Sequence, residues 1–221
     1  MKLRLLLASV AIATTISVQG QDWANHELTL TEIEQEWNVQ QFYTIGSEET
    51  PNIRTYFLSF ALAYPNEFLH EMIGKMMGVP GSSLKIGNYV EDAKNGYISG
   101  ELLAQFESKV QMCYWRMNDG NILIGVAFEG YNEGSMAAET EDEMDESCEN
   151  GMMFYVIEKE TVIWRPRTLF AVCGRDFHLP DYKITLPRVG KDIQLTFNKE
   201  KKRGNSWLLK WNGSGFNVVK K

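Results

Sequence analysis

The sequence has few of the residues that metal and thiol chemistry require. Its 221 residues include only three histidines and three cysteines. No two cysteines have the C-x-x-C spacing of a zinc ribbon or a thioredoxin-like site. His70 and Glu71 begin a pattern like H-E-x-x-H, but Gly74 stands where the second zinc-binding histidine is needed. We therefore expect neither a zinc enzyme nor a bound cofactor.

Motifs for phosphate binding and for nucleophilic catalysis are also missing. The chain contains no G-x-x-x-x-G-K-[ST], no G-x-G-x-x-G after a predicted strand and no G-x-S-x-G. Ser82 and Lys85 have the S-x-x-K spacing of penicillin-recognising enzymes, but the partner motifs S-D-N and K-T-G are absent. A match this short is common by chance, so we assign it no catalytic role.

Long apolar runs are restricted to the N-terminus. Lys2 and Arg4 precede an apolar stretch over 5–16, and residues 18–20 (Val-Gln-Gly) provide small residues for a cleavage site. The stretch is shorter than the roughly 20 apolar residues of a membrane span. We expect residues 1–20 to be a signal peptide and residues 21–221 to form one periplasmic or secreted domain without a membrane span.

The chain has no surplus of basic residues. Its formal net charge is −7, from 29 Asp and Glu against 22 Lys and Arg, which argues against a general nucleic-acid binder. Hydrophobic residues make up 44% of the chain and include six tryptophans, so a sizeable core can form. These totals are typical of a globular protein.

Apolar residues repeat with helical spacing up to about residue 88. A first helix is expected after Thr31 as N-cap, with an apolar stripe over 33–42. Gly46 and Pro51 are expected to end it. Pro65 removes a backbone donor and disfavours a helical Tyr64, so a second helix should end near Ala63. A third should begin at Pro65, a favoured first-turn residue, and stop at Gly78.

From residue 89 the apolar period changes from 3.6 to 2. Two turns, at 94–96 and 118–121, have the Asn-Gly and Asp-Gly chemistry of hairpins, and a short helix over 100–108 is expected between them. The expected strands are 89–93, 97–99, 110–117, 122–129, 152–157, 161–164, 168–173, 183–186, 193–197, 207–211 and 216–219. Short turns without intervening helices indicate antiparallel pairing. We predict an α+β fold in which N-terminal helices (about 21–88) pack on a C-terminal antiparallel β-sheet (about 89–221).

The most pronounced local feature is an acidic stretch over 139–149, with seven carboxylates and no Lys or Arg. It does not fit an EF-hand, because with Gly151 at position six the twelfth position is Ile157 rather than Glu. Three interpretations stay open: a solvated loop kept extended by repulsion, a docking surface for a cation-rich partner, and a looser calcium site made of Asp142, Asp145 and Glu146.

Four tryptophans fall on expected strands: Trp115, Trp164, Trp207 and Trp211. Exposed together, they would form a flat platform for sugar rings, whose C–H faces pack against aromatic surfaces. Buried together, they would belong to the core, as large apolar side chains usually do. Both interpretations stay open.

The three cysteines allow one disulfide and one free thiol in an oxidising compartment. We favour a disulfide between Cys148 and Cys173, because Cys113 lies in the middle of an expected apolar strand. The other pairings, and three reduced thiols, remain alternatives.

Several stretches together resemble uncharacterised secreted or periplasmic proteins of the Bacteroidetes kind. They are the export signal, the helical stretch FLSFALAYPNEF, the hairpins KNGYIS and CYWRMNDGNILIGV, and the closing LLKWNGSGF. The resemblance covers most of the chain after the signal. It implies an exported protein and carries over no activity, cofactor or catalytic residue.

We expect a non-catalytic binding module whose partner is a glycan or an envelope protein. The alternative is a periplasmic hydrolase that acts on glycan or cell-wall material, because Glu129, Glu158 and Glu160 lie at expected strand ends where paired carboxyl groups could act. A structural protein of the envelope is a third interpretation.

Overall fold

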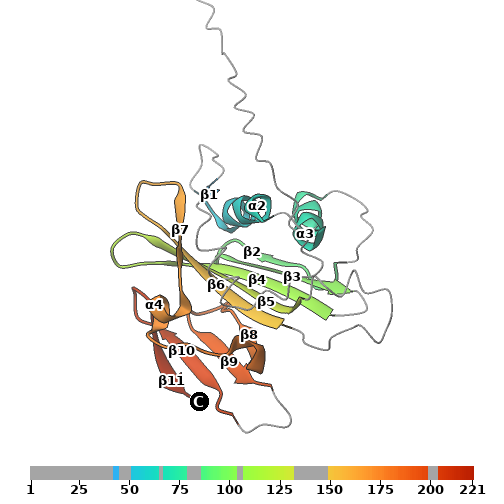
Figure 1. The fold of residues 1–221 in the computed structure, drawn as a ribbon. Coiled ribbons are helices and arrows are strands. Elements are labelled where there is room, and N and C mark those ends of the chain that lie inside the picture. Colours follow the sequence, from blue (N-terminus) through green and yellow to red (C-terminus); the bar gives the residue numbers. More distant parts are fainter. Residues whose placement is uncertain are drawn as a thin grey trace, which may run out of the picture.

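The structure is a computed structural model that describes residues 42–44, 51–64, 67–78, 86–103, 107–131, 149–198 and 204–221. Most of these residues lie in strands, which form two antiparallel sheets (Figure 1). The chain enters the larger sheet first, and the smaller sheet follows near the C-terminus.

The larger sheet has seven strands in the order β1-β7-β6-β5-β4-β3-β2. From β2 to β7, each strand pairs with the strand that follows it along the chain. The exception is β1, which pairs with β7 at one edge of the sheet. Their bounds are β1 Phe42–Tyr43, β2 Val90–Asp92, β3 Tyr97–Leu103, β4 Glu107–Arg116, β5 Ile122–Tyr131, β6 Glu149–Ile157 and β7 Ile163–Arg167.

The smaller sheet has four strands in the order β11-β10-β9-β8. It is a meander, so each strand pairs with its sequence neighbour. The strands are β8 Tyr182–Thr185, β9 Ile193–Phe197, β10 Trp207–Trp211 and β11 Phe216–Lys220. The helices are α2 Ile53–Ala63, α3 Glu67–Met77, the short α4 Leu169–Cys173 and a single 3₁₀ turn, η4 Leu179–Asp181.

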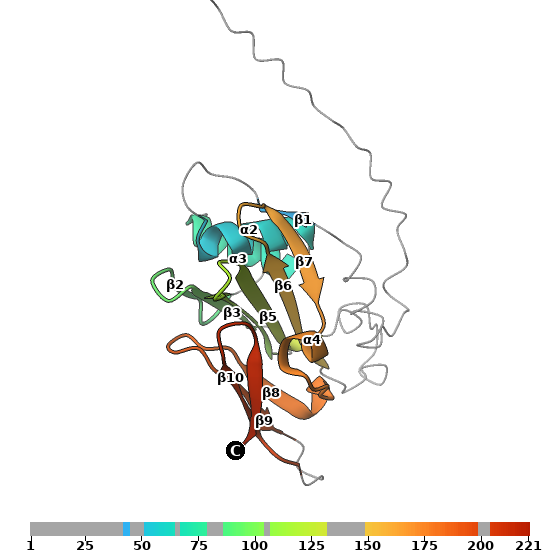
Figure 2. The ribbon, with the colours of Figure 1, turned by 90° about the vertical axis from the view of Figure 1, so that its left-hand side faces the viewer.

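The larger sheet is buried on both faces. Since successive side chains of a strand point to opposite sides, each strand can contribute residues to both cores. On β4, Met112 contacts the core under α2 and α3, whereas Cys113 and Trp115 contact the core under the smaller sheet. Figure 2 shows the two helices and the smaller sheet at opposite ends of the molecule, with the larger sheet between them. The result is three layers around two hydrophobic cores.

The helical layer is fixed by a few large side chains. Phe57 and Phe60 of α2 are 0% exposed and pack on the larger sheet. Burial of each ring contributes about 2 kcal/mol by area. From α3, Phe68, Leu69 and Met72 join the same core. These two helices confirm the predicted break at Ala63.

The second layer depends on side chains that close the free edge of β8. The Gln111 amide, 1% exposed, donates to the Ile184 carbonyl (2.9 Å) and accepts from the Leu186 N–H (3.2 Å). Glu129 accepts from the Ile184 N–H (2.8 Å), and Asn150 donates to the Tyr182 carbonyl (2.7 Å). Three neighbouring strands of the larger sheet thus satisfy the β8 backbone groups that a missing strand would have paired.

The predicted α+β fold is wrong. The described chain is mostly β, and its strands form two sheets rather than one C-terminal sheet with helices packed on it. The helices do not form a bundle: α2 and α3 cover one face of the larger sheet, whereas the smaller sheet and α4 cover the other. The connection between the two sheets runs through α4 and η4, and because the sequence predicts a strand over 168–173, it indicates no break between the sheets.

Three local predictions are also wrong. Phe42 and Tyr43 are expected within the first helix, but they form a strand in which Phe42 pairs with Trp164; residues 31–41 of that prediction lie outside the described residues. The expected helix over 100–108 is strand on both sides of 104–106. The expected strand 168–173 is helix α4, because the Thr168 hydroxyl accepts from the Ala171 N–H (3.1 Å) and caps the helix.

Replacing Gln111 should destabilise the fold strongly. Gln111→Leu leaves the Ile184 carbonyl and the Leu186 N–H buried without partners, which costs about 1–3 kcal/mol for each group. We expect urea unfolding to report a loss of about 2–4 kcal/mol. Gln194→Leu is the matched control, since Gln194 is exposed on β9; its change should stay within about 0.5 kcal/mol. Equal losses in both variants would contradict a special role for Gln111.

Candidate ligand-binding site

The inner face of the smaller sheet is only partly covered by the larger one. The strand registers align Ile184, Leu195, Trp207 and Lys220 across the four strands. Ile184 and Leu195 are 0% exposed, Trp207 is half-buried and Lys220 is exposed. Along this row cover is therefore lost toward β11, although Phe216 at the start of β11 is buried, and Trp207 lies at the boundary between core and solvent.

Four aromatic side chains gather at this boundary, and we refer to Phe177, Tyr182, Phe197 and Trp207 as the aromatic cluster. Phe177 contacts Tyr182 and Trp207 with ring centroids 5.9 and 6.0 Å apart, and Tyr182 contacts Phe197 at 5.6 Å. All three contacts are edge-to-face, the geometry that aromatic quadrupoles favour. The Trp207 Nε1–H also donates to the Tyr182 hydroxyl (3.3 Å).

Arg175 lies over the aromatic cluster. Its guanidinium carbon is 4.0 Å from the Trp207 ring centroid and 5.2 Å from that of Phe177. Helix α4 ends at Gly174, whose φ of 68° turns the chain toward the smaller sheet. The Cys173 thiol then donates to the Arg175 carbonyl (3.1 Å). Burial raises the pKa of Cys173, so the thiol keeps the proton that it donates.

The aromatic cluster also explains Gly204. A Cβ at this position would overlap the Phe197 ring, so a larger residue would displace the ring from Tyr182. The cluster therefore depends on the close approach of the backbone at Gly204, shortly before β10.

The cations at the aromatic cluster have no carboxylate partner in the part of the chain that the structure describes. Arg175 makes cation–π contacts but no ion pair there, and Lys220, the cross-strand neighbour of Trp207, makes none either. An arginine held flat on an aromatic ring loses less side-chain freedom when it binds a ligand. Such a site suits a ligand with an apolar face and an anionic or hydroxyl-rich group.

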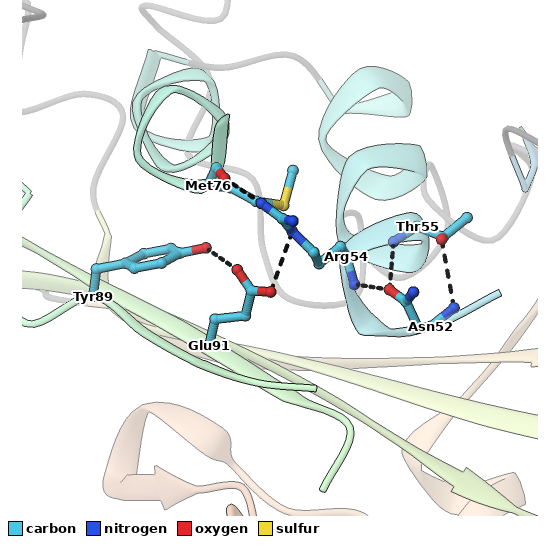
Figure 3. Close-up of polar contacts among 6 residues, drawn as sticks. All are labelled: Asn52, Arg54, Thr55, Met76, Tyr89 and Glu91. Atoms are coloured by element: carbon cyan, nitrogen blue, oxygen red, sulfur yellow. Dashed lines mark hydrogen bonds and ion pairs between the residues drawn. The ribbon is translucent and has the colours of Figure 1, made fainter. Parts of the chain in front are cut away.

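A second polar network surrounds Arg54, which differs from Arg175 in having a carboxylate partner (Figure 3). Arg54 donates to the Met76 carbonyl at the end of α3 and pairs with Glu91 of β2 (3.2 Å). Glu91 also accepts from the Tyr89 hydroxyl (3.1 Å), and burial followed by the Glu91 charge raises the pKa of Tyr89. The network joins α2, α3 and the sheet edge. Since the charges of Arg54 and Glu91 neutralise each other, we assign it a structural role rather than a binding role.

The four predicted tryptophans do not form one platform. Trp164 is 0% exposed in the core under α2, and its indole donates to Thr44 (2.8 Å). Trp115 stacks on Trp211 in the other core, with centroids 5.9 Å apart and an interplanar angle of 23°. Among the described residues, Trp207 is the one of the four with a cation over its ring. A sugar platform made of all four tryptophans therefore does not form.

The carboxylates considered for glycoside hydrolysis are dispersed. Glu129 lies one residue beyond Phe128, which pairs with Gly151, whereas Glu158 follows Ile157 at the other end of the same strand pair. The register separates them by eight residues along the strands, which at about 3.3 Å per residue is roughly 26 Å. Glycosidases need their two carboxyl groups within about 5–10 Å. Glu158 pairs with Arg165 (3.2 Å), and Glu160 is exposed in a turn.

Other residues singled out in the sequence have structural roles or lie outside the described ranges. His178 pairs with Asp181 (3.2 Å). Cys113 and Cys173 have free, buried thiols. The remaining positions, which include the predicted disulfide partner and calcium ligands, lie outside the described residues: Ser82, Lys85, Asp142, Asp145, Glu146 and Cys148. Within the described residues no three His, Cys, Asp or Glu side chains gather as a metal site would require.

The sequence offered only a weak signal for Arg175 and Phe177, which lie in an irregular segment without periodicity. The better signal was the spacing of aromatic residues along β8, β9 and β10, which places Tyr182, Phe197 and Trp207 on the same face as the buried residues. That spacing does not predict that Trp207 is only half-buried.

None of the helices that the structure describes is long and apolar enough to cross a membrane. Comparisons of the chain with family models, with curated proteins and with solved structures find no match. The functional argument therefore depends on the chemistry of the site alone.

Glu129 provides a test of how the two sheets are joined. Burial is the main cause that raises its pKa, against the opposing effects of Lys109, Lys183 and the Ile184 N–H. The raised pKa favours the protonated form in the folded state. Its contribution to stability is therefore fully present below the ordinary glutamate pKa and is lost as pH rises through the raised value.

We expect Glu129→Gln to remove this pH dependence and keep the acceptor for Ile184. In urea unfolding between pH 4 and 7, the variant should gain stability relative to the original protein as pH rises. Glu129→Ala leaves the Ile184 N–H without an acceptor and should cost about 1–2 kcal/mol at pH 7. A Glu129→Gln variant as unstable as Glu129→Ala at pH 7 would show that the charge itself is needed.

Proposed function

We propose that this protein is an exported, non-catalytic binding module whose ligand is a glycan. The observation that carries the proposal is the Arg175 guanidinium, 4.0 Å above a half-buried Trp207 and without a carboxylate partner among the described residues. The export signal predicted over 1–20 supports a periplasmic or secreted location, where glycans are abundant.

A glycan fits the aromatic cluster better than a purely apolar or purely anionic ligand does. The C–H face of a sugar ring packs against the exposed edges of the aromatic side chains. The guanidinium of Arg175 and the ammonium of Lys220 then bind hydroxyl or carboxylate oxygens of the same sugar. An acidic sugar, which offers both surfaces, should bind more tightly than a neutral one.

A panel of short neutral and uronate-bearing oligosaccharides, titrated calorimetrically, tests the proposal. Arg175→Ala should weaken binding of the best ligand about tenfold or more, since a charged hydrogen bond contributes about 1.5–3 kcal/mol. Trp207→Leu should weaken it as well, because it removes the ring that holds Arg175.

Arg167→Ala is the matched control for the charge change. Arg167 is exposed on β7 and belongs to the other sheet, so its removal should leave the affinity unchanged. Binding that survives Arg175→Ala and Trp207→Leu, or a panel without any binder, would refute the proposal. Capture of an envelope protein through the same residues, with no glycan bound, would refute the choice of ligand.

A further inference from the structure

The charge of the chain is unevenly divided. Residues 182–221, which contain the smaller sheet, hold ten Lys and Arg and two Asp and Glu, a net charge of +8. Because the whole chain carries −7, residues 1–181 carry −15. Two carboxylates against ten cations leave this part of the chain with an excess of positive charge.

Part of this positive charge lies on the outer face of the smaller sheet, which we call the basic face and define by Lys183, Lys210 and Lys221. Lys183 alternates with the buried Ile184, and Lys210 with the buried Leu209, so both point away from the core. The Lys221 ammonium donates to Gln194 (3.1 Å), an exposed outward residue of β9.

The surroundings of the basic face do not neutralise it. Its other exposed residues are neutral: Thr185, Gln194, Thr196, Asn217 and Val219. Asp192, which precedes β9, is the one acidic residue among the described residues of 182–221; it accepts from the Trp211 N–H (3.0 Å) and forms no ion pair with a described lysine or arginine. Within the described residues Lys183 and Lys210 form no ion pair, whereas Lys109 and Arg165 of the larger sheet do.

The basic face is open to a large partner. Figures 1 and 2 place the smaller sheet at the end of the molecule opposite α2 and α3. The exposure of its outward residues shows that no described element covers them. Lys183 and Lys210 lie on β8 and β10, two strands apart, and the registers offset them by four residues along the strands, which makes a separation of roughly 16 Å. A single small anion cannot contact both lysines, but a chain with repeated charges can.

We propose that the basic face docks an extended anionic polysaccharide by charge complementarity. The choice of a polysaccharide among polyanions rests on the proposed function, in which the aromatic cluster of the same sheet binds a sugar. The basic face contributes affinity that depends on polymer charge and salt, because each lysine contact releases counterions and is screened by salt. The residues involved differ from those of the aromatic cluster, so the two sites can be tested separately.

Fluorescently labelled heparin, titrated at several salt concentrations, is the probe. The double variant Lys183→Glu/Lys210→Glu should bind it about tenfold more weakly or worse, with a shallower salt dependence. The matched control Lys94→Glu/Arg167→Glu makes the same charge change at exposed positions of the larger sheet; it should stay within about twofold of the original protein. Circular dichroism and thermal unfolding confirm that both variants fold.

The outcomes separate the basic face from the aromatic cluster. Loss of heparin binding in Lys183→Glu/Lys210→Glu, with short oligosaccharides still bound, supports the basic face. If no short oligosaccharide binds but heparin binding still depends on these lysines, the proposed function fails and polyanion docking stands. Equal effects in the test and control variants, or no heparin binding at low salt, would overturn the proposal.

Two further arms test the source of the anion. Single-stranded DNA and phosphatidylglycerol vesicles replace heparin under the same conditions. Tighter binding to either, with the same dependence on Lys183 and Lys210, would overturn the assignment to a polysaccharide. Self-association at low salt that requires these lysines, without heparin binding, would instead assign the face to acidic residues of a second copy.

Discussion

The arrangement of the molecule depends on how one edge strand is closed. β8 has a strand neighbour on one side only, and on the other side Gln111, Glu129 and Asn150 satisfy its backbone groups. These three side chains come from adjacent strands of the larger sheet and point to the same face. They act as a substitute for a strand, so the smaller sheet cannot slide without leaving buried donors and acceptors unpaired. Because β8 is held there, Tyr182 lies at the boundary where the aromatic cluster forms.

Local chemistry made the hairpins and the helix break predictable. The turns at 94–96 and 118–121 contain Gly96 and Gly120, whose φ values of 68° and 89° few other residues adopt. Asn52 caps α2 by accepting from the Arg54 N–H (2.9 Å), and Gly78 follows α3 with a φ of 69°. Each of these features is decided within about four residues of the chain.

The two-sheet architecture was not predictable in the same way. Alternation shows that β8 and β9 have one buried face, but it does not show what covers that face. The position of Gln111 did not indicate a second sheet either. A glutamine in an apolar strand can bridge to another sheet or lie at a polar edge, and the sequence pattern is the same in both cases. At α4, the β-branched and aromatic residues favoured a strand, and the cap formed by Thr168 with Gly174 at the other end decided the outcome.

Net charge was a poor guide to partners, because it averages two unlike regions. A total of −7 argues against a general nucleic-acid binder, yet residues 182–221, which contain the smaller sheet and its loops, carry +8. Electrostatic attraction acts over about one Debye length, roughly 8–10 Å in physiological salt, so a partner at the outer face of this sheet is influenced mainly by nearby lysines. The composition of a single structural layer is therefore the relevant quantity.

Arg175 shows why structural and binding roles need separate measurements. Its guanidinium covers part of an indole that the sheets leave exposed, and a cation–π contact at such a site contributes about 0.5–1 kcal/mol. If covering the ring were its only role, removal would lower the melting temperature slightly and leave sugar affinity intact. If the ring serves to hold the guanidinium ready for a ligand, affinity falls far more than stability does. Among the described residues Arg175 has no carboxylate partner, so its charge is available to an anionic or hydroxyl group of a ligand, which favours the second role.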